Sequence, residues 1–265
     1  MIASQTSNFS IPDRVNILGV GIHPVNMHTV IPIIFDSLKN KHKGYVCVTG
    51  VHGVIEAQSN LAFKRILNRS FLTVPDGMPI VWTGKIMGFK NIGRVYGPDL
   101  MREICDKGRA FGIRHFLYGG RPGVAQLLQK RLEELYPGIN IVGTFTPPFR
   151  PLNPAEKAEL FRTLECTKPD ILWVGISTPK QELFMHEYLE ELPTILMFGV
   201  GAAFDIITGL VPQAPCWVQR CGLEWFFRLC TEPRRLFKRY AKIVPLYPIL
   251  LTLQFMGLKK FPLIK

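Results

Sequence analysis

The chain has 265 residues, of which 47% are hydrophobic and 20% are charged, and its formal net charge is +12. This length suffices for one large α/β domain with or without an appendage, and the hydrophobic content supports a sizeable core. The positive charge favours an anionic partner, which can be a nucleic acid, a phosphorylated substrate or a membrane surface.

The basic residues concentrate at the C-terminal end. Residues 213–265 contain ten Lys or Arg and two acidic residues, a net +8 of the total +12. We therefore divide the chain into an N-terminal tail (1–14), a main α/β domain (15–212) and a basic, amphipathic C-terminal appendage (213–265).

The six cysteines form no C-x-x-C pair, which excludes a usual structural zinc site, and we expect no disulfide framework. Residues 1–13 lack a signal-peptide pattern. No run reaches about 18 uninterrupted apolar residues, since prolines interrupt the nearest, 243–258. We expect a cytoplasmic protein, peripheral on the inner face of the cell membrane.

Short apolar runs alternate with stretches of helical periodicity. In chain order, the predicted strands cover 15–20, 44–49, 71–74, 115–118, 140–144, 171–175 and 194–200. The predicted helices cover 27–38, 54–67, 79–87, 98–107, 124–136, 154–166 and 180–191. This alternation predicts an α/β fold with a mostly parallel, Rossmann-like sheet and helices on both faces. Ligands of such sheets bind at the carboxyl ends of the strands.

Asp76 follows a predicted strand and precedes a predicted helix, in T-V-P-D-G-M-P. A carboxylate there can accept a proton from a sugar hydroxyl that attacks an anomeric carbon. Asp-Gly is also a common turn former, and the local sequence leaves both interpretations open.

Two glycine-rich loops follow predicted strands. Gly119, Gly120 and Gly123 open a helix, where backbone amides can approach a diphosphate. Gly199 and Gly201 show the same pattern. In both loops the glycines can instead serve a simple turn or close packing.

Two further polar residues are candidates for sugar contacts. Gln181 can donate hydrogen bonds to sugar hydroxyls, although Thr178 and Pro179 before it also fit an ordinary helix start. His52 is either a site residue or a polar residue at a helix start.

The appendage interleaves aromatic and basic residues, in R-C-G-L-E-W-F-F-R-L-C-T-E-P-R-R-L-F-K-R-Y. It can lie on anionic lipid, capture phosphate through arginines, bind nucleic acid, or form a packed helix with a solvated basic face. The apolar run 243–258 favours a membrane over nucleic acid.

The motifs together resemble the WecG/TagA/CpsF family of bacterial glycosyltransferases, from about residue 15 to 240. The resemblance rests on six fragments in family order: V-P-D-G-M-P (74–79), G-R-V-Y-G-P-D-L (93–100), L-Y-G-G-R-P-G (117–123), P-D-I-L-W-V-G-I-S-T-P-K-Q-E (169–182), G-V-G-A-A-F-D (199–205) and G-L-E-W-F-F-R-L-C-T-E-P-R-R-L (222–236).

The resemblance implies an inverting, metal-independent transferase that needs no cofactor. Its donor would be a UDP-sugar and its acceptor a polyprenyl-diphosphate-linked sugar, for a surface polysaccharide or teichoic acid. A homo-oligomer is compatible with this. The alternatives are a non-catalytic, nucleotide-binding scaffold at the membrane and a nucleic-acid-binding protein, for which no recognised module is present.

The family's functional residues map onto this chain as follows. The general base falls on Asp76, the acceptor-side threonine on Thr49, the arginine near the lipid phosphate on Arg94, and the glutamine on Gln181. Arg228 and Arg235 are our choice for the arginines with which the appendage completes the site.

One position departs from the family pattern. Val51 stands where the family often has an asparagine that contacts the sugar, and His52 follows it. Both a hexose donor and an N-acetylhexosamine donor therefore stay open.

Overall fold

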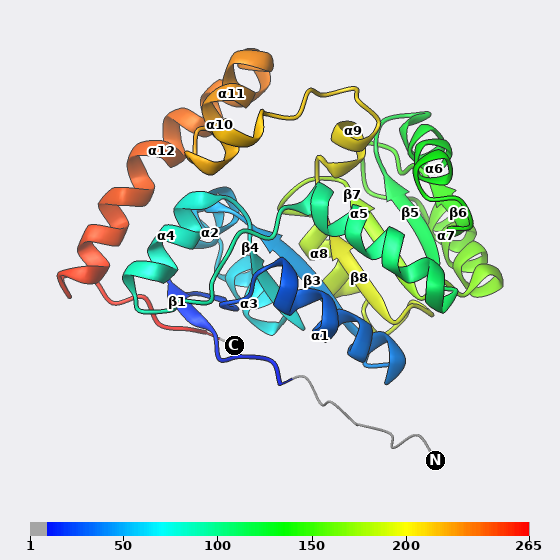
Figure 1. The fold of residues 1–265 in the computed structure, drawn as a ribbon, viewed down its shortest axis with the longest axis horizontal. Coiled ribbons are helices and arrows are strands. Elements are labelled where there is room, and N and C mark those ends of the chain that lie inside the picture. Colours follow the sequence, from blue (N-terminus) through cyan, green and yellow to red (C-terminus); the bar gives the residue numbers. More distant parts are fainter. Residues whose placement is uncertain (1–9, 265) are drawn as a thin grey trace.

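The computed structural model describes residues 10–264, so that residues 1–9 of the predicted tail and Lys265 lie outside it. Its centre is a six-stranded parallel sheet in the order β4-β3-β8-β7-β5-β6 (Figure 1). The strands are β3 (Gly44–Thr49), β4 (Leu72–Pro75), β5 (Arg114–Gly119), β6 (Asn140–Phe145), β7 (Ile171–Gly175) and β8 (Leu196–Gly199).

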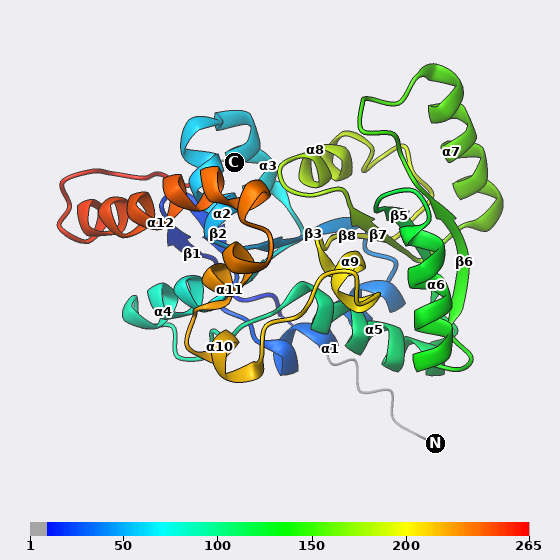
Figure 2. The same cartoon turned by 90° about the horizontal axis from the view of Figure 1, so that it is seen from above.

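Helices cover both faces of this sheet, as predicted (Figure 2). Successive strand residues point to opposite faces: Tyr45 and Cys47 pack into one hydrophobic cluster and Val46 into the other. The first cluster includes residues of α2 (Val51–Ser59), α3 (Leu61–Arg69), α4 (Met78–Ile86), α7 (Pro154–Thr167) and α8 (Lys180–Glu187). The second includes residues of α1 (Met27–Lys39), α5 (Gly97–Gly108), α6 (Val124–Leu135) and α9 (Ala203–Ile207). A short 3-10 turn, η1 (Arg109–Phe111), follows α5.

The first predicted strand is not part of the parallel sheet. Residues 15–22 instead form an antiparallel hairpin, β1 (Val15–Ile17) and β2 (Val20–Ile22). Its turn residues Leu18 and Gly19 both have positive φ, +53° and +80°, as a two-residue hairpin turn that matches strand twist requires. The turn therefore ends the strand after three residues.

The predicted helix 54–67 is two helices. Asn60 adopts an extended conformation between α2 and α3, and its side-chain oxygen accepts a hydrogen bond of 2.9 Å from the Phe63 amide. Asn60 thus caps the start of α3, which compensates for the break.

The helices that follow α9 are α10 (Cys216–Arg220), α11 (Glu224–Thr231) and α12 (Pro233–Phe255), here called the C-terminal helices. In Figure 1, α10 and α11 lie above the sheet, and α12 runs down one side of the body. Its residues Ile243, Tyr247 and Leu250 are buried in the same cluster as α2 and the hairpin. Within residues 10–264, no helix has the length and apolarity to cross a membrane.

Polar contacts fix the end of α12 to the hairpin. The Gln254 side chain accepts a hydrogen bond from the Leu18 amide and donates one to the Asn16 carbonyl, each 2.9 Å long. The Asn16 side chain then donates to the carbonyl of Phe261, a buried residue beyond the helix, over 2.8 Å. These contacts join residues about 240 positions apart and hold α12 against the body.

We expect Gln254→Leu to destabilise the protein by about 1–3 kcal/mol, because it leaves a backbone donor and a backbone acceptor without partners. The measurement is urea unfolding. Thr252→Ala is the control, since the exposed Thr252 hydroxyl bonds only to Pro248 of its own helix, and its effect should stay within about 1 kcal/mol. Equal effects of the two substitutions would contradict this account of α12.

Candidate active site

A cavity of about 1080 Å³ opens at the carboxyl ends of the parallel strands. The segments after β3, β4, β5, β7 and β8 form one side, and the C-terminal helices form the other. The position agrees with the rule for open α/β sheets. Of the residues predicted from sequence, it is lined by Thr49, His52, Asp76, Gly120, Gln181, Gly201, Arg228 and Arg235.

Asp76 lies where the ends of β3 and β4 meet. Its amide donates a 3.0 Å hydrogen bond to the Thr49 carbonyl. A side chain at Gly50 would begin 3.1 Å from the Asp76 carbonyl oxygen, a tight contact that glycine avoids. The hydroxyl of Thr49 is buried and has no hydrogen-bond partner among the described residues, which leaves it available to a ligand.

Asp76 is half-buried and lines the cavity. Burial raises its pKa to about 7, although the positive charges of Arg94 and Arg228 oppose this shift. The negative charge of Glu224 raises the pKa further. A carboxylate with this pKa can take up a proton near neutral pH, as a general base must.

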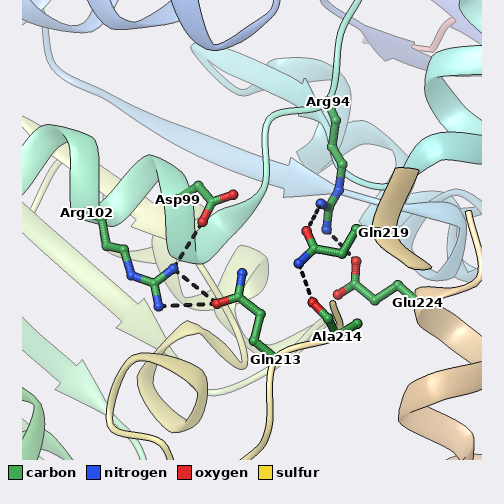
Figure 3. A network of polar contacts seen from close by, with 7 residues as sticks. All are labelled: Arg94, Asp99, Arg102, Gln213, Ala214, Gln219 and Glu224. Carbon is green, nitrogen blue, oxygen red and sulfur yellow. Dashed lines mark hydrogen bonds and ion pairs between the residues drawn. The ribbon is translucent and has the colours of Figure 1, made fainter. Parts of the chain in front are cut away.

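Arg94 does not line the cavity. Its guanidinium lies 4.0 Å over the Tyr96 ring and donates hydrogen bonds to Gln219 and Glu224 of the C-terminal helices (Figure 3). Gln219 in turn donates to the Ala214 carbonyl. Arg94 thus joins the segment before α5 to the C-terminal helices.

His52 lies in the first turn of α2 and lines the cavity. Burial lowers its pKa to about 4, and the positive charges of Arg239 and Lys242 add to this effect. The ring is therefore neutral at pH 7 and can donate or accept a hydrogen bond without carrying charge.

Gln181 is buried and its amide is already engaged. Its oxygen accepts a 3.0 Å hydrogen bond from the Gly201 amide, and its nitrogen donates to Glu182 over 3.0 Å. Thr178 also donates to Glu182, whose other carboxylate oxygen is buried without a partner among residues 10–264. Burial raises the pKa of Glu182. Gln181 thereby orients the loop after β8.

The predicted glycines separate into two groups. Gly120 and Gly201 line the cavity, but their amides donate to the Gly175 carbonyl and to Gln181. Gly119, Gly123 and Gly199 do not line it. A side chain at Gly119 would collide with Gly175, which shows that close packing accounts for this glycine.

Arginines of the C-terminal helices supply positive charge to the cavity. Arg228, Arg235 and Arg239 all line it. Glu232 pairs with both Arg228 and Arg235, and the Arg228 Nε atom is buried without a partner among the described residues. Glu232 lines the same side and offsets part of this charge, and the arginines still provide donors that suit an anionic ligand.

The sequence alone did not identify three further polar residues of the site, Glu182, Gln219 and Glu224. Glu224 is one of only two acidic residues in the basic segment 213–265, and this contrast in charge could have marked it as a candidate site residue. No comparable sequence signal marks Glu182, because a glutamate in the first turn of a helix is common. Groups of three or more His, Cys, Asp or Glu arranged to hold a metal ion are absent from the described residues.

Residues 15–260 match the glycosyl transferase WecG/TagA/CpsF family. A protein of Bacillus spizizenii, named N-acetylglucosaminyldiphosphoundecaprenol N-acetyl-beta-D-mannosaminyltransferase, is 30% identical over 197 residues, which are 74% of this chain and 75% of the relative. A protein of the same name from Bacillus subtilis is 29% identical over 178 residues, 67% of each chain. The resemblance inferred from the motifs is thus confirmed, and the chain belongs to the WecG/TagA/CpsF family and is a glycosyltransferase.

Proposed function

We propose that this glycosyltransferase moves one sugar from a UDP-sugar to a polyprenyl-diphosphate-linked sugar, with inversion at the anomeric carbon. The observation that carries the proposal is Asp76, a carboxyl with a pKa of about 7 in a cavity that is also lined by three arginines of the C-terminal helices. The names of the two Bacillus relatives, which specify a diphosphoundecaprenol-linked acceptor, support the lipid-linked acceptor.

The reaction is a single displacement. Asp76 accepts the proton of the acceptor hydroxyl while the hydroxyl oxygen forms a bond to the anomeric carbon. The bond from that carbon to the diphosphate oxygen breaks, and its electron pair leaves with UDP. Attack from the face opposite the leaving group inverts the anomeric configuration.

The leaving diphosphate gathers negative charge, and Arg228, Arg235 and Arg239 are placed to stabilise it. Arginine offers two parallel donors to phosphate oxygens, which suits this role. The amides of Gly120 and Gly201 contribute less, because each already bonds within the protein. We propose that these arginines replace a metal ion.

The C-terminal helices are the part that meets the lipid. They combine basic residues with exposed apolar side chains, a composition that binds at the surface of anionic membranes. The exposed apolar residues on or beside these helices are Trp217, Leu223, Phe226, Phe237, Val244, Ile249, Phe255, Met256 and Leu258. We infer a peripheral location at the inner face of the cell membrane.

The donor sugar depends on the start of α2. Val51 occupies the first helical position and lines the cavity beside His52. An apolar side chain here offers no hydrogen bond to a sugar substituent, so a hexose and an N-acetylhexosamine both remain candidates.

The reaction class is tested by UDP release from a panel of UDP-sugars, with and without a polyprenyl-diphosphate-sugar acceptor in liposomes, in the presence of EDTA. We expect acceptor-dependent release from one donor, unaffected by EDTA. Activity that EDTA removes and Mg²⁺ or Mn²⁺ restores would refute metal independence, and no transfer from any donor by folded protein would refute the proposed reaction.

Asp76→Asn removes the proposed base while keeping the shape of the side chain. We expect transfer to fall by about 100-fold or more. Thermal stability at pH 8 should stay equal or rise, because the folded-state pKa of Asp76 is raised and its ionisation above pH 7 therefore opposes folding.

The matched control is Asp106→Asn, which changes a carboxylate on α5 that pairs with Arg109 and does not line the cavity. Its activity should equal that of the unaltered protein. Loss of activity through Asp76→Asn that is accompanied by unfolding would leave no support for a base at this position.

The pH dependence of kcat/KM should show an acidic limb near pH 7. Asp76 is protonated below its pKa of about 7 and cannot accept a proton there, so that the rate should fall about tenfold for each pH unit below 7. A limb centred near pH 4, typical of a solvated aspartate, would contradict the buried carboxyl.

A further inference from the structure

Arg94 is held by the C-terminal helices rather than presented to the cavity. Its side chain is 15% exposed and pairs with Glu224, whose side chain is 18% exposed. Gln219 and Glu224 both line the cavity, whereas Arg94 does not. In Figure 3 the guanidinium points toward these two side chains, which come from α10 and α11.

The same arginine lies close to Asp76. The Val95 amide donates a 2.8 Å hydrogen bond to the carbonyl of Pro75, the residue before Asp76. This bond ties the segment that carries Arg94 to the end of β4. Burial and the negative charges of Glu224 and Asp76 raise the pKa of Tyr96, as expected if all three groups surround one point.

Charged and titratable groups face Asp76 from four segments. The segment before α5 contributes a cation and a phenol, α5 and α11 contribute acids and a further cation, and α12 contributes a second phenol. These residues are Arg94, Tyr96, Asp99, Glu224, Arg228 and Tyr240. Of the two acids, only Glu224 is bonded to the arginine beside Asp76.

We propose that Glu224 is a positioning residue for the reaction: by pairing with Arg94, it turns this guanidinium toward the C-terminal helices and offsets its charge, so that Asp76 remains an effective base. The inference rests on the proposed function, in which Asp76 is that base. It assigns a role to an acidic residue in an otherwise basic segment.

The physical reason is the low dielectric around the three groups. A cation without a counter-ion stabilises a nearby carboxylate and lowers its affinity for a proton. Without Glu224, the full charge of Arg94 would act on Asp76, and the negative charge of Glu224 would no longer oppose ionisation. Both changes make Asp76 a weaker base.

The test is the pH profile of kcat/KM for sugar transfer in Glu224→Gln and Arg94→Gln. The glutamine at 224 can still bond to Arg94 but carries no charge, and we expect the acidic limb to move down by about one pH unit, with a lower plateau. Arg94→Gln removes the cation and leaves Glu224 unpaired, so the limb should move up by a similar amount.

Gln213→Leu is the matched control. Gln213 accepts hydrogen bonds from Arg102 and so also joins the C-terminal segment to α5, but it does not line the cavity (Figure 3). Its acidic limb should stay at the wild-type pH. Circular dichroism and thermal unfolding establish that each variant is folded.

A downward shift of the acidic limb in Glu224→Gln together with an upward shift in Arg94→Gln supports the proposal. If only one of the two variants folds, the direction of its shift alone tests the proposal. A uniform loss of rate with an unmoved limb, or displacement in the same direction, overturns it and leaves Glu224 a structural contact. Absence of transfer by the wild-type protein would instead count against the proposed function.

Discussion

The C-terminal helices form one side of the cavity at the carboxyl ends of the strands, and Asp76 lines this cavity. Burial is the largest influence on this group, and it raises the pKa to about 7 although two arginines act in the opposite direction. An aspartate in water has a pKa of about 3.9 and is a poor proton acceptor at neutral pH. Glu224 and Arg228 of α11 both act on this pKa, so the proton affinity of Asp76 depends on how the C-terminal helices sit on the body.

That placement rests on contacts at several points along the chain. The end of α12 is fixed to the β1–β2 hairpin through Gln254, and its middle is buried against the body through Ile243 and Tyr247. Arg94 joins α10 and α11 to the segment beside Asp76. The hairpin, which lies outside the parallel sheet, thus supports the helices that complete the cavity.

The fold class, the sheet and the position of the cavity were predictable because buried parallel strands have continuous apolar runs and ligands bind at their carboxyl ends. The hairpin was not, because the positive φ of Leu18 is unusual for a leucine and leaves no local signal. Asn60 is a typical N-cap residue, but the apolar periodicity on both sides of it led to the prediction of one helix instead of two.

The sequence correctly placed at the cavity those predicted residues that directly follow a strand, and it was less informative about residues whose position depends on partners far away in the chain. Thr49 and Asp76 line the cavity because strand order alone brings them together. The amides of Gly120 and Gly201 have internal partners, and Arg94 pairs with residues more than 120 positions away. Pairings between residues so far apart along the chain produce no periodic pattern in a single sequence.

Burial, base strength and charge in this cavity are linked through the same helices. Arg228, Arg235 and Arg239 reach the cavity from α11 and α12, and α11 also carries Glu224, whose charge acts on the pKa of Asp76. Displacing these helices would remove the three arginines from the cavity, and with them the cations that we propose stabilise the leaving diphosphate; it would also expose Asp76 and lower its pKa. In the reaction that we propose, the base and the anion site would therefore form in one step, which would limit transfer of the sugar to water while the cavity is open.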